Sequence, residues 1–435
     1  MKILSGWGRF PKVYANEVFP NNIKELKEIL SKNPRSYIAR GNGRSYGDAA
    51  INKSLTINIT KLNNIISWDK ETGILKAEAG TLIKDVIEHC LKDGWFPYVT
   101  PGTKYVTLGG SIACDVHGKN HHLEGSFGNY VKSFELLDKN NNLIKCSPNQ
   151  NYKFFKWTIG GMGLTGVITK CTIQLKKISS GWINQTLIKN NNLVDTLSSF
   201  EEFNGSTYSV AWIDCLAKGK NFGRSIIYTG EHASSGTVSK KNIFPKARKK
   251  MFSLKITPPS FILNNLTVMV FNWLYFSLRP QRANSIVDWD KYFYPLDSIG
   301  HWNKLYGRNG FFQFQCVLPL NNSQKGCEDL LKLIQSKSSG AFLAVLKKFG
   351  KGNGHMSFPI EGITIAIDFK VSKKNIELAN QLYKIVSDNN GKIYLAKDSL
   401  LKSDINQEIT IKSMANDSVQ DNRVESQLFR RLNAK

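Results

Sequence analysis

The spacing of apolar residues predicts alternating helices and strands over the first part of the chain. Apolar residues at helical spacing follow Asn21 and Asn22 and predict a helix over Ile23–Leu30. Leu55–Thr60 alternates apolar and polar residues, as a half-buried strand does. The same reasoning predicts strands over Gly73–Thr81 and Gly166–Ile178 and a helix over Leu82–Leu91.

The pattern changes after Ile178, and Ser179–Trp182 is a plausible boundary. Strand-like runs then alternate with helical stretches such as Cys327–Ser336 and Lys374–Asn389, which indicates an antiparallel sheet flanked by helices. At 435 residues the chain is too long for one ordinary core. We therefore expect an α+β protein with one domain over residues 1–178, a second over 179–393 and a C-terminal segment, 394–435, that returns to the first domain.

One stretch of the second domain combines positive charge with apolar residues. An uncharged run from Ile256 to Leu278 follows a basic cluster, and residues 240–278 are predicted to face a membrane, with the cluster toward anionic headgroups. A buried helix or an oligomer contact is the main alternative. A membrane-spanning helix fits less well, because the run is short and contains asparagines. The basic cluster comprises Lys240, Lys241, Lys246, Arg248, Lys249, Lys250 and Lys255.

Composition adds an expectation about partners and compartment. The formal net charge of +25 attracts polyanions or anionic lipid surfaces, or else reflects a Lys- and Asn-rich composition. No zinc-finger spacing or RNA-binding motif supports nucleic acid as a partner. The seven cysteines are scattered, which is typical of a reducing compartment, and the N-terminus lacks the apolar run of a signal peptide. A cytoplasmic protein is expected, with peripheral attachment to the inner face of the membrane.

Three glycine-rich segments are the strongest candidates for a binding site. The loop Arg40–Asp48 can approach a phosphate closely, because glycine permits unusual backbone angles and consecutive N–H groups can cradle an anion. Thr100–Gly128 is small, polar and glycine-dense, so it is poor core material and is expected to wrap a ligand. Trp157–Ile168 again places glycines before a strand. No carboxylate or cysteine cluster completes a ligand set around His121 and His122, so no metal is predicted.

Taken in order, these segments resemble the FAD domain of the vanillyl-alcohol oxidase (PCMH-type) flavoprotein family. Many members of that family attach FAD covalently through a histidine in the first loop. This chain has Arg44, Ser45 and Tyr46 there, so the resemblance implies non-covalent FAD. Within that family, runs such as CDVHGKNHH (residues 114–122) and LKKFGKGN (346–353) resemble the decaprenylphosphoryl-β-D-ribose 2′-oxidase family over essentially the whole chain.

The resemblance implies a reaction. Members of that family oxidise the 2′-hydroxyl of a polyprenyl-phosphoryl ribose to a ketone. A partner NAD(P)H-dependent short-chain reductase then forms the arabinose epimer, which is used for cell-wall polysaccharide. An aldonolactone or sugar-alcohol oxidase of the same superfamily is the alternative. A non-catalytic protein that binds a membrane or a polyanion is the alternative of another class.

The resemblance also implies a set of site residues. Lys397 is expected beside the isoalloxazine as a fixed cation, and His117 as either a base or a flavin contact. The substrate residues implied are Tyr46, Lys119, Trp212, Gln313, Gln315 and Lys347. The FAD contacts implied are Ala39, Arg40, Gly41, Asn42, Gly43, Arg44, Ser45, Tyr46, Gly47, Asp48, Ala49, Gly102, Thr107, Leu108, Gly109, Gly110, Cys114, Asp115, Val116, His117, Ile168 and Tyr394.

Two positions depart from the family pattern. Ala366 stands where a cysteine is common, and Thr364 where an asparagine is usual. Any role that requires a thiol at residue 366 is therefore absent, and these two positions bear on which sugar is accepted.

Overall fold

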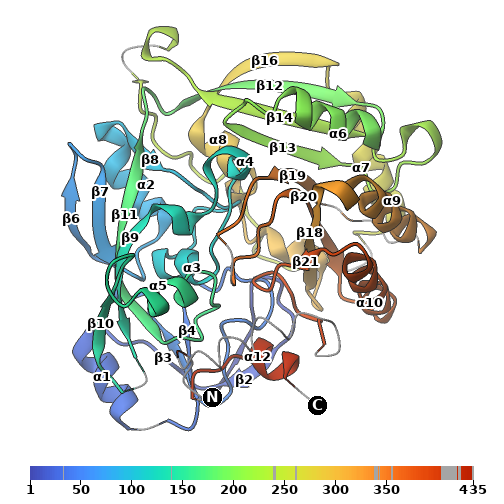
Figure 1. Cartoon of the computed structure of the whole chain (residues 1–435). Helices are drawn as coiled ribbons and strands as arrows, with labels where there is room; N and C mark the ends of the chain where they lie inside the picture. The colour runs from blue at the N-terminus through green and yellow to red at the C-terminus, as the bar shows by residue number, and fades with distance from the viewer. Residues whose placement is uncertain are drawn as a thin grey trace.

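The computed structural model describes residues 1–32, 34–138, 140–238, 242–259, 262–337, 341, 343–353, 356–402, 419 and 423–433. Its helices and antiparallel sheets confirm the expected α+β class. Two smaller sheets built from the first part of the chain lie beside one large sheet built from the rest, and the last helix returns to the first part (Figure 1).

The first small sheet is parallel and carries the first glycine loop. Its strand order is β3-β5-β4, and the loop leaves the end of β4. Helix α1 begins where Asn22 accepts a hydrogen bond from the backbone N–H of Glu25, 2.9 Å away, which caps the helix as the sequence predicted. The elements here are β1 (Lys2–Leu4), β2 (Val13–Ala15), β3 (Glu17–Val18), α1 (Ile23–Ser31), β4 (Ile38–Arg40) and β5 (Thr56–Asn58).

The second small sheet has the order β10-β9-β11-β7-β6, and β8 pairs with β11 beyond β7. The predicted strands and helix of this region are confirmed, with ends that differ by a residue or more. The elements are β6 (Ile65–Asp69), β7 (Ile74–Glu78), α2 (Ile83–Cys90), β8 (Trp95–Pro97), α3 (Leu108–Ala113), α4 (His121–Glu124), β9 (Val131–Leu137), β10 (Leu143–Cys146), α5 (Tyr152–Thr158) and β11 (Val167–Lys177).

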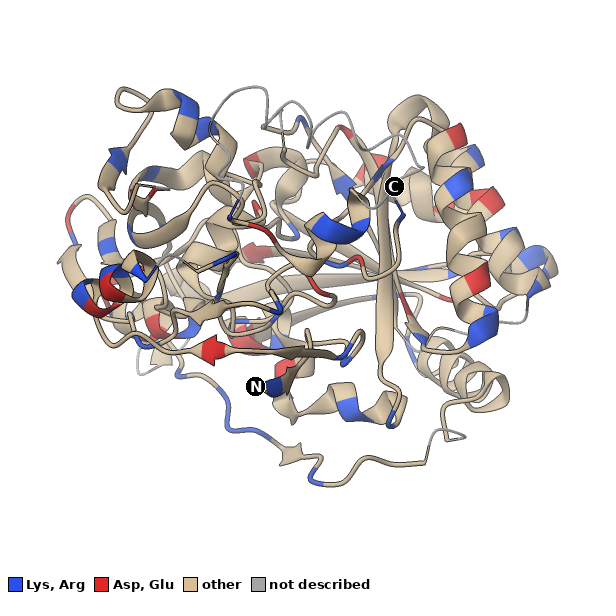
Figure 2. Ribbon diagram, turned by 90° about the horizontal axis from the view of Figure 1, so that it is seen from below, with Lys and Arg blue, Asp and Glu red and all other residues tan. Residues whose placement is uncertain are grey.

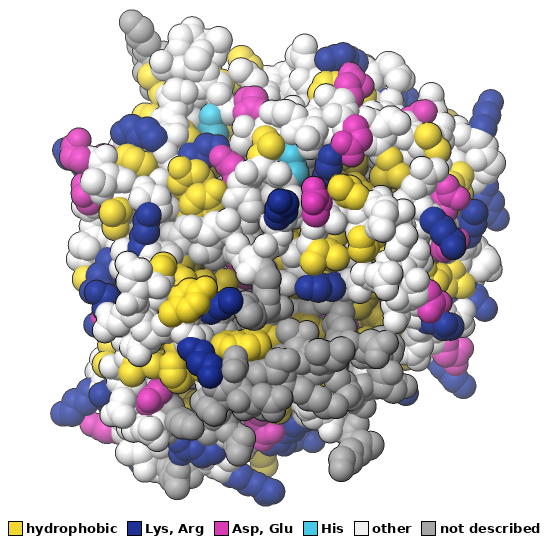
Figure 3. Space-filling view, in the orientation of Figure 1, with side chains coloured by type: hydrophobic (Ala, Val, Ile, Leu, Met, Phe, Trp, Pro, Cys, Tyr) yellow, Lys and Arg dark blue, Asp and Glu magenta, His cyan; other side chains and the backbone are white. Residues whose placement is uncertain are grey.

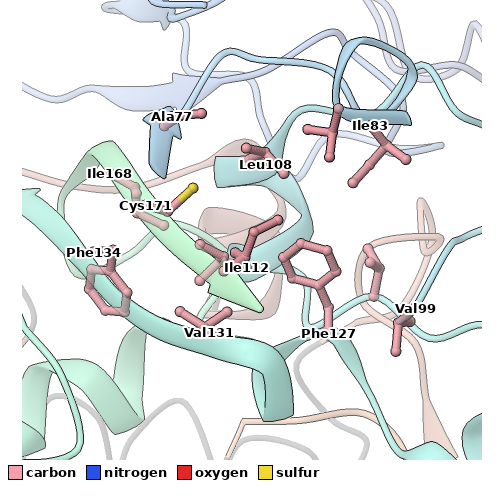
Figure 4. Packing of buried hydrophobic residues seen from close by; sticks show 14 of the residues in the cluster. Ala77, Ile83, Val99, Leu108, Ile112, Phe127, Val131, Phe134, Ile168 and Cys171 are labelled. Atoms are coloured by element: carbon pink, nitrogen blue, oxygen red, sulfur yellow. The ribbon is translucent and has the colours of Figure 1, made fainter. Parts of the chain in front are cut away.

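Helix α3 corrects one expectation about the second glycine segment. We expected poor core material there, but Leu108 and Ile112 are fully buried. Their side chains pack against Ile168 and Phe127, as Figure 4 shows. Glycine and serine on the same short helix keep it thin enough to lie close to the sheet. The segment is therefore both a wall of the core and, on its other side, available to a ligand.

The large sheet has the order β16-β12-β14-β13-β19-β20-β18-β21. Helices α6, α9 and α10 cover one of its faces (Figure 1). The elements are β12 (Trp182–Asn190), α6 (Leu193–Glu202), β13 (Tyr208–Ile213), β14 (Ser225–His232), β15 (Phe252–Ser253), α7 (Asn265–Ser277), β16 (Arg282–Asp288), α8 (Trp289–Phe293), β17 (Ile299–Gly300), β18 (Phe311–Pro319), α9 (Leu320–Ser336), β19 (Ala344–Phe349), β20 (Gly362–Lys370), α10 (Lys373–Asp388) and β21 (Lys392–Ile393).

Strand register decides which side chains of this sheet face the glycine segments. Gln313 lies opposite Asp368 and Gln315 opposite Ala366, and residues opposite one another in an antiparallel pair point to the same face. The intervening residues of β18, such as Phe312 and Phe314, pack with the helices. Two polar glutamines two residues apart therefore point away from the helical layer.

Part of the basic and apolar stretch folds as helix α7. This helix is neither fully buried nor long enough to span a membrane. Val268 and Phe276 are buried toward the sheet, whereas Leu266 and Trp273 are 69% and 58% exposed. No helix in the described part of the chain is long and apolar enough to cross a membrane. Residues 240, 241, 260 and 261 of the predicted insertion lie outside the described residues.

The net charge is spread over the molecule. Lys and Arg lie in all parts of the ribbon, with Asp and Glu among them (Figure 2). On the face seen in Figure 3, basic, acidic and hydrophobic side chains are mixed. The charge of the whole chain thus does not by itself locate a partner.

Candidate functional site

The three glycine segments meet around helix α3. A side chain at Gly41 would bring its Cβ within 2.3 Å of Thr107 Oγ1, so the first loop can approach the second segment this closely only as glycine. From the third segment, the Gly160 backbone N–H donates to the Ile112 carbonyl at 3.0 Å. Segments that are far apart in sequence therefore form one wall.

Polar atoms without protein partners mark this wall as a place for a polar cofactor. Among the described residues, Arg44 Nε and His117 Nδ1 are buried and accept or donate no hydrogen bond. The Arg44 guanidinium lies over the ring of Trp7, 4.1 Å from its centroid. A Cβ on Gly102 would meet no atom within 4 Å, so this glycine borders open space. A cation, a ring N–H and an open glycine suit the phosphates and ring edge of FAD.

Asp115 holds the second glycine segment in shape. Its buried carboxylate accepts hydrogen bonds from Ser126 Oγ at 2.7 Å and from the Gly128 backbone N–H at 2.8 Å. Asn353 and Ser357, from the large-sheet domain, also donate to it. Burial raises the pKa of this carboxyl, and the four donors oppose the rise. The Asp115 side chain thus joins the two domains behind the site and does not point to a ligand.

His117 is held by a chain of hydrogen bonds from the large sheet. The Gln315 amide N–H donates to His117 Nε2 at 3.0 Å and lies 3.3 Å from Thr364 Oγ1, whose hydroxyl donates to the Cys316 carbonyl. Because Nε2 accepts in this arrangement, the ring proton is on Nδ1. Burial and nearby lysines hold the pKa of His117 well below its usual range. His117 is therefore neutral and presents Nδ1–H as a donor.

Three buried lysines, Lys119, Lys347 and Lys397, interact electrostatically in sequence, and the last two also act on His117. Lys119 Nζ donates to the carbonyls of Tyr292 and Phe293 at 2.6 and 3.2 Å. Desolvation and the charge of Lys347 lower the pKa of Lys119 to about 7. Desolvation and Lys397 lower the pKa of Lys347 to about 7 as well. Buried ammonium groups that repel one another electrostatically form a site that favours an anion.

Lys397 stands between the first glycine loop and the large sheet. Its Nζ lies 3.7 Å from the centroid of the Tyr46 ring, in a cation–π contact. Tyr394, three residues earlier, donates its hydroxyl to the Cys114 carbonyl at 3.0 Å, and its ring lies 5.0 Å from that of His117. The segment after β21 therefore places Lys397 beside the first glycine loop and close to His117.

The remaining predicted residues differ in what they can contact. Leu108 and Ile168 are core side chains, so only their backbone is available to a cofactor. Asp48 pairs with Arg431, and the Ala49 side chain is buried in the core of the large sheet. Trp212 lies on the site face one strand beyond β19, but its ring contacts Tyr275 of α7 at 4.9 Å. The structure does not bring Trp212 into contact with the lysines.

Sequence reasoning missed several residues that hold the site. Asp368 accepts hydrogen bonds from Gln313 at 2.6 Å and from the Tyr306 hydroxyl at 3.1 Å. The ring of Phe349 lies 4.8 Å from that of His117. Residues 311–318 and 363–369 each alternate in polarity like a strand. If the two had been paired as antiparallel neighbours, Asp368 would have been predicted on the same face as Gln313 and Gln315. Nothing in the sequence indicated the aromatic contact.

Comparison with known proteins agrees with this geometry. Residues 15–147 match the model of an FAD binding domain. The chain is 33% identical over 416 residues to decaprenylphosphoryl-β-D-ribose oxidase of Mycolicibacterium smegmatis, which covers 92% of this chain and 89% of that protein. The chain belongs to the decaprenylphosphoryl-β-D-ribose oxidase family. It is therefore an FAD-dependent oxidoreductase, and helix α3 lies within the residues that match the FAD binding domain.

More distant relatives match only part of the chain. L-gulonolactone oxidase of Bos taurus is 28% identical over 174 residues, 39% of this chain and 38% of that protein. D-lactate dehydrogenase of Anaerostipes hadrus is 26% identical over 200 residues, 44% of this chain and 42% of that protein. The similarity to the oxidase of Mycolicibacterium smegmatis, over 92% of the chain, therefore extends into the large-sheet domain, whereas these two relatives match less than half of the chain.

Proposed function

We propose that this protein oxidises the 2′-hydroxyl of a polyprenyl-phosphoryl-β-D-ribose to a ketone, as the first half of epimerisation to arabinose. The single observation that carries the proposal is the pair of buried lysines, Lys119 and Lys347; Lys347 Nζ lies 5.7 Å from the centroid of the Phe349 ring, which contacts His117. Desolvation lowers the pKa of each lysine, the charge of a neighbouring lysine lowers it further, and no carboxylate is among the causes. An anionic substrate group would relieve this repulsion, whereas a neutral lactone would not.

The residues of the site have distinct tasks in this proposal. Bound FAD would supply the hydride acceptor for the C–H bond of the oxidised carbon. His117 would donate Nδ1–H to a substrate or cofactor oxygen, since its Nε2 is occupied by Gln315. Lys397 would place a positive charge where negative charge develops. The Arg44–Tyr46 stretch contains no histidine, so FAD is proposed to be held without a covalent bond.

Anaerobic flavin bleaching tests the proposal. Purified protein reconstituted with FAD is mixed with a short-chain polyprenyl-phosphoryl-β-D-ribose, with the arabinose epimer, and with a soluble aldonolactone. We expect bleaching by the ribose compound and none by the lactone. Bleaching by the lactone alone would replace the proposal with the aldonolactone oxidase alternative, which rests on the partial similarity to L-gulonolactone oxidase.

The product suggests a partner. A keto-sugar on a lipid carrier must be reduced to give the epimer, and a separate NAD(P)H-dependent short-chain reductase would supply the hydride. The arabinose so formed would serve cell-wall polysaccharide synthesis. A cytoplasmic site at the inner face of the membrane would give both enzymes access to the lipid carrier.

Helix α7 is the surface that we propose meets the membrane. Its outer side exposes Met269, Trp273 and Leu266, and Arg279 and Arg282 follow the helix. Apolar side chains rimmed by cations suit an anionic lipid surface. The sugar phosphate of a lipid-linked substrate could then enter the protein while the lipid tail stays in the bilayer.

Vesicle flotation tests this contact with a matched pair of variants. Met269 on α7 and Val194 on α6 are both 52% exposed, but α6 covers the opposite face of the large sheet. We expect Met269→Glu to reduce binding to vesicles that contain phosphatidylglycerol about tenfold, and Val194→Glu to leave binding unchanged. Equal binding by both variants would contradict a membrane role for α7.

A further inference from the structure

Asp368 is a buried carboxylate near the C-terminal end of β20, on the face of the sheet that carries Gln313 and Gln315. It is 1% exposed and lies opposite Gln313 in the register of β18 and β20. The Gln313 amide and the Tyr306 hydroxyl both donate to it, at 2.6 and 3.1 Å. Neither donor carries a charge. A buried carboxylate with only neutral donors needs a cation nearby to stay ionised.

One aromatic cluster connects Lys397 with Asp368: Lys397 Nζ lies over the Tyr46 ring, and Tyr46 packs in the same cluster as Tyr306, which donates to Asp368. Burial raises the pKa of Asp368, and the charge of Lys397 opposes that rise. Burial lowers the pKa of Lys397. The charges of Asp368 and Cys114 both oppose that fall. The buried Tyr46 ring, over which the Lys397 ammonium lies, is subject to the charge of Asp368 and to a hydrogen bond with Gln313. These side chains therefore form one electrostatic unit.

We propose that Asp368 is a positioning residue, whose carboxylate acts across the aromatic cluster to keep the Lys397 ammonium charged at the flavin. The carboxylate and the ammonium come from different elements, β20 and the segment after β21. Tyr306 and Gln313 fix the carboxylate, and the Tyr46 ring supports the ammonium. The inference rests on FAD binding in this family and does not depend on which sugar is oxidised.

The lysines around Lys397 explain why a carboxylate is needed. Lys347 and His117 both lie within the electrostatic reach of Lys397, as the lowered pKa of each shows. Loss of water on burial favours release of the Lys397 proton. A neutral amine could not stabilise negative charge on a reduced flavin. Asp368 is the carboxylate placed to oppose this loss.

The test is the midpoint potential of bound FAD measured against pH in Asp368→Asn. Asparagine keeps the shape and accepts from Tyr306, but it removes the charge. In the native protein, loss of the Lys397 proton gives a break in the plot of potential against pH. We expect Asp368→Asn to move this break down by about one pH unit or more, and to raise the potential at acid pH.

Controls separate this role from a structural one. Glu201→Gln removes a surface carboxylate paired with Lys348, and we expect it to leave the break in place. Lys397→Arg should abolish the break, because guanidinium stays charged. If Asp368→Asn does not fold, Tyr306→Phe removes one donor and should move the break in the same direction by less.

An unchanged break in an Asp368→Asn protein that binds FAD stoichiometrically would overturn the inference, because Asp368 would then be neutral in the native site. A protein less stable to urea with an unmoved break would assign Asp368 a purely structural part. Neither outcome uses a sugar substrate. Failure here thus leaves the proposed oxidation of the ribose untouched, and failure of the bleaching experiment leaves this inference untouched.

Discussion

Replacing Arg431 by alanine should destabilise the protein strongly although the residue lies far from the reacting groups in sequence. On helix α12 (Gln427–Leu432), Arg431 pairs through Nη2 with Asp48 and through Nη1 with Asp398, each at 2.9 Å. These two carboxylates are only 3% and 2% exposed. Loss of the guanidinium leaves two buried charges without their cation, which costs about 3–5 kcal/mol.

The same change should weaken FAD binding. Asp398 follows Lys397. Its carbonyl oxygen would lie 2.0 Å from a Cβ on Gly47, so the first glycine loop and the segment that carries Lys397 are in direct contact. Asp48 ends the first glycine loop. Arg431 therefore ties that loop to the segment that carries Lys397, and without it the flavin wall loses a fixed edge. We expect FAD affinity to fall about tenfold or more.

Urea unfolding of the apoprotein and flavin fluorescence quenching measure these two effects. Arg430→Ala is the matched control, because Arg430 pairs with Glu425 in a half-exposed position and should cost no more than about 1 kcal/mol. Asp48→Asn in the Arg431→Ala background should recover part of the loss, since one unpaired charge is then gone. Equal losses for Arg430→Ala and Arg431→Ala, with no recovery, would refute the reasoning.

Two further predictions concern the lysines and Asp115. The pKa values of Lys119 and Lys347, lowered to about 7, mean that the folded apoprotein binds fewer protons than the unfolded chain above that pH, so urea titrations should show stability rising from about pH 7 toward pH 10. Affinity for the lipid-phosphate sugar should fall over pH 7–9, because the bound phosphate requires both ammonium groups. Asp115 has φ at 38°, which asparagine tolerates better than alanine. Asp115→Asn should therefore cost about 1–2 kcal/mol in urea unfolding and Asp115→Ala about 3–5, and equal costs would contradict the hydrogen-bond account.

Much of the fold followed from periodicity. The predicted helices and strands of the first part, including Ile23–Leu30 and Gly166–Ile178, correspond to α1 and β11 because their apolar faces pack in one core. Helix α9 begins seven residues before its predicted start at Cys327, since Leu320–Gly326 is polar and gives little helical signal. Local patterns report which residues are buried, but they report poorly on where an exposed turn of helix begins.

The site itself could be predicted only as far as motifs reach. The resemblance brought Lys119, His117 and Lys397 forward because each lies in a recognisable run. Asp368 and Tyr306 are 62 residues apart, and they meet because Tyr306 ends a short helix just before β18, which pairs with β20. Their hydrogen bonds depend on tertiary register, which periodicity does not encode. The core role of Leu108 was hidden for the opposite reason, since glycines around it suggested a loop.

The departures at residues 364 and 366 become interpretable once the register is known. Thr364 accepts from Gln315 and donates to Cys316, so it fixes the amide that in turn fixes the proton of His117. An asparagine could also accept from Gln315, and this departure preserves the function of the position. Ala366 lies opposite Gln315 and beside Val345 on the same face, 6% exposed. Its side chain is smaller than a thiol and lies next to Gln315, which holds His117, so we expect the departure at residue 366 to change the shape of this part of the site and not its charge.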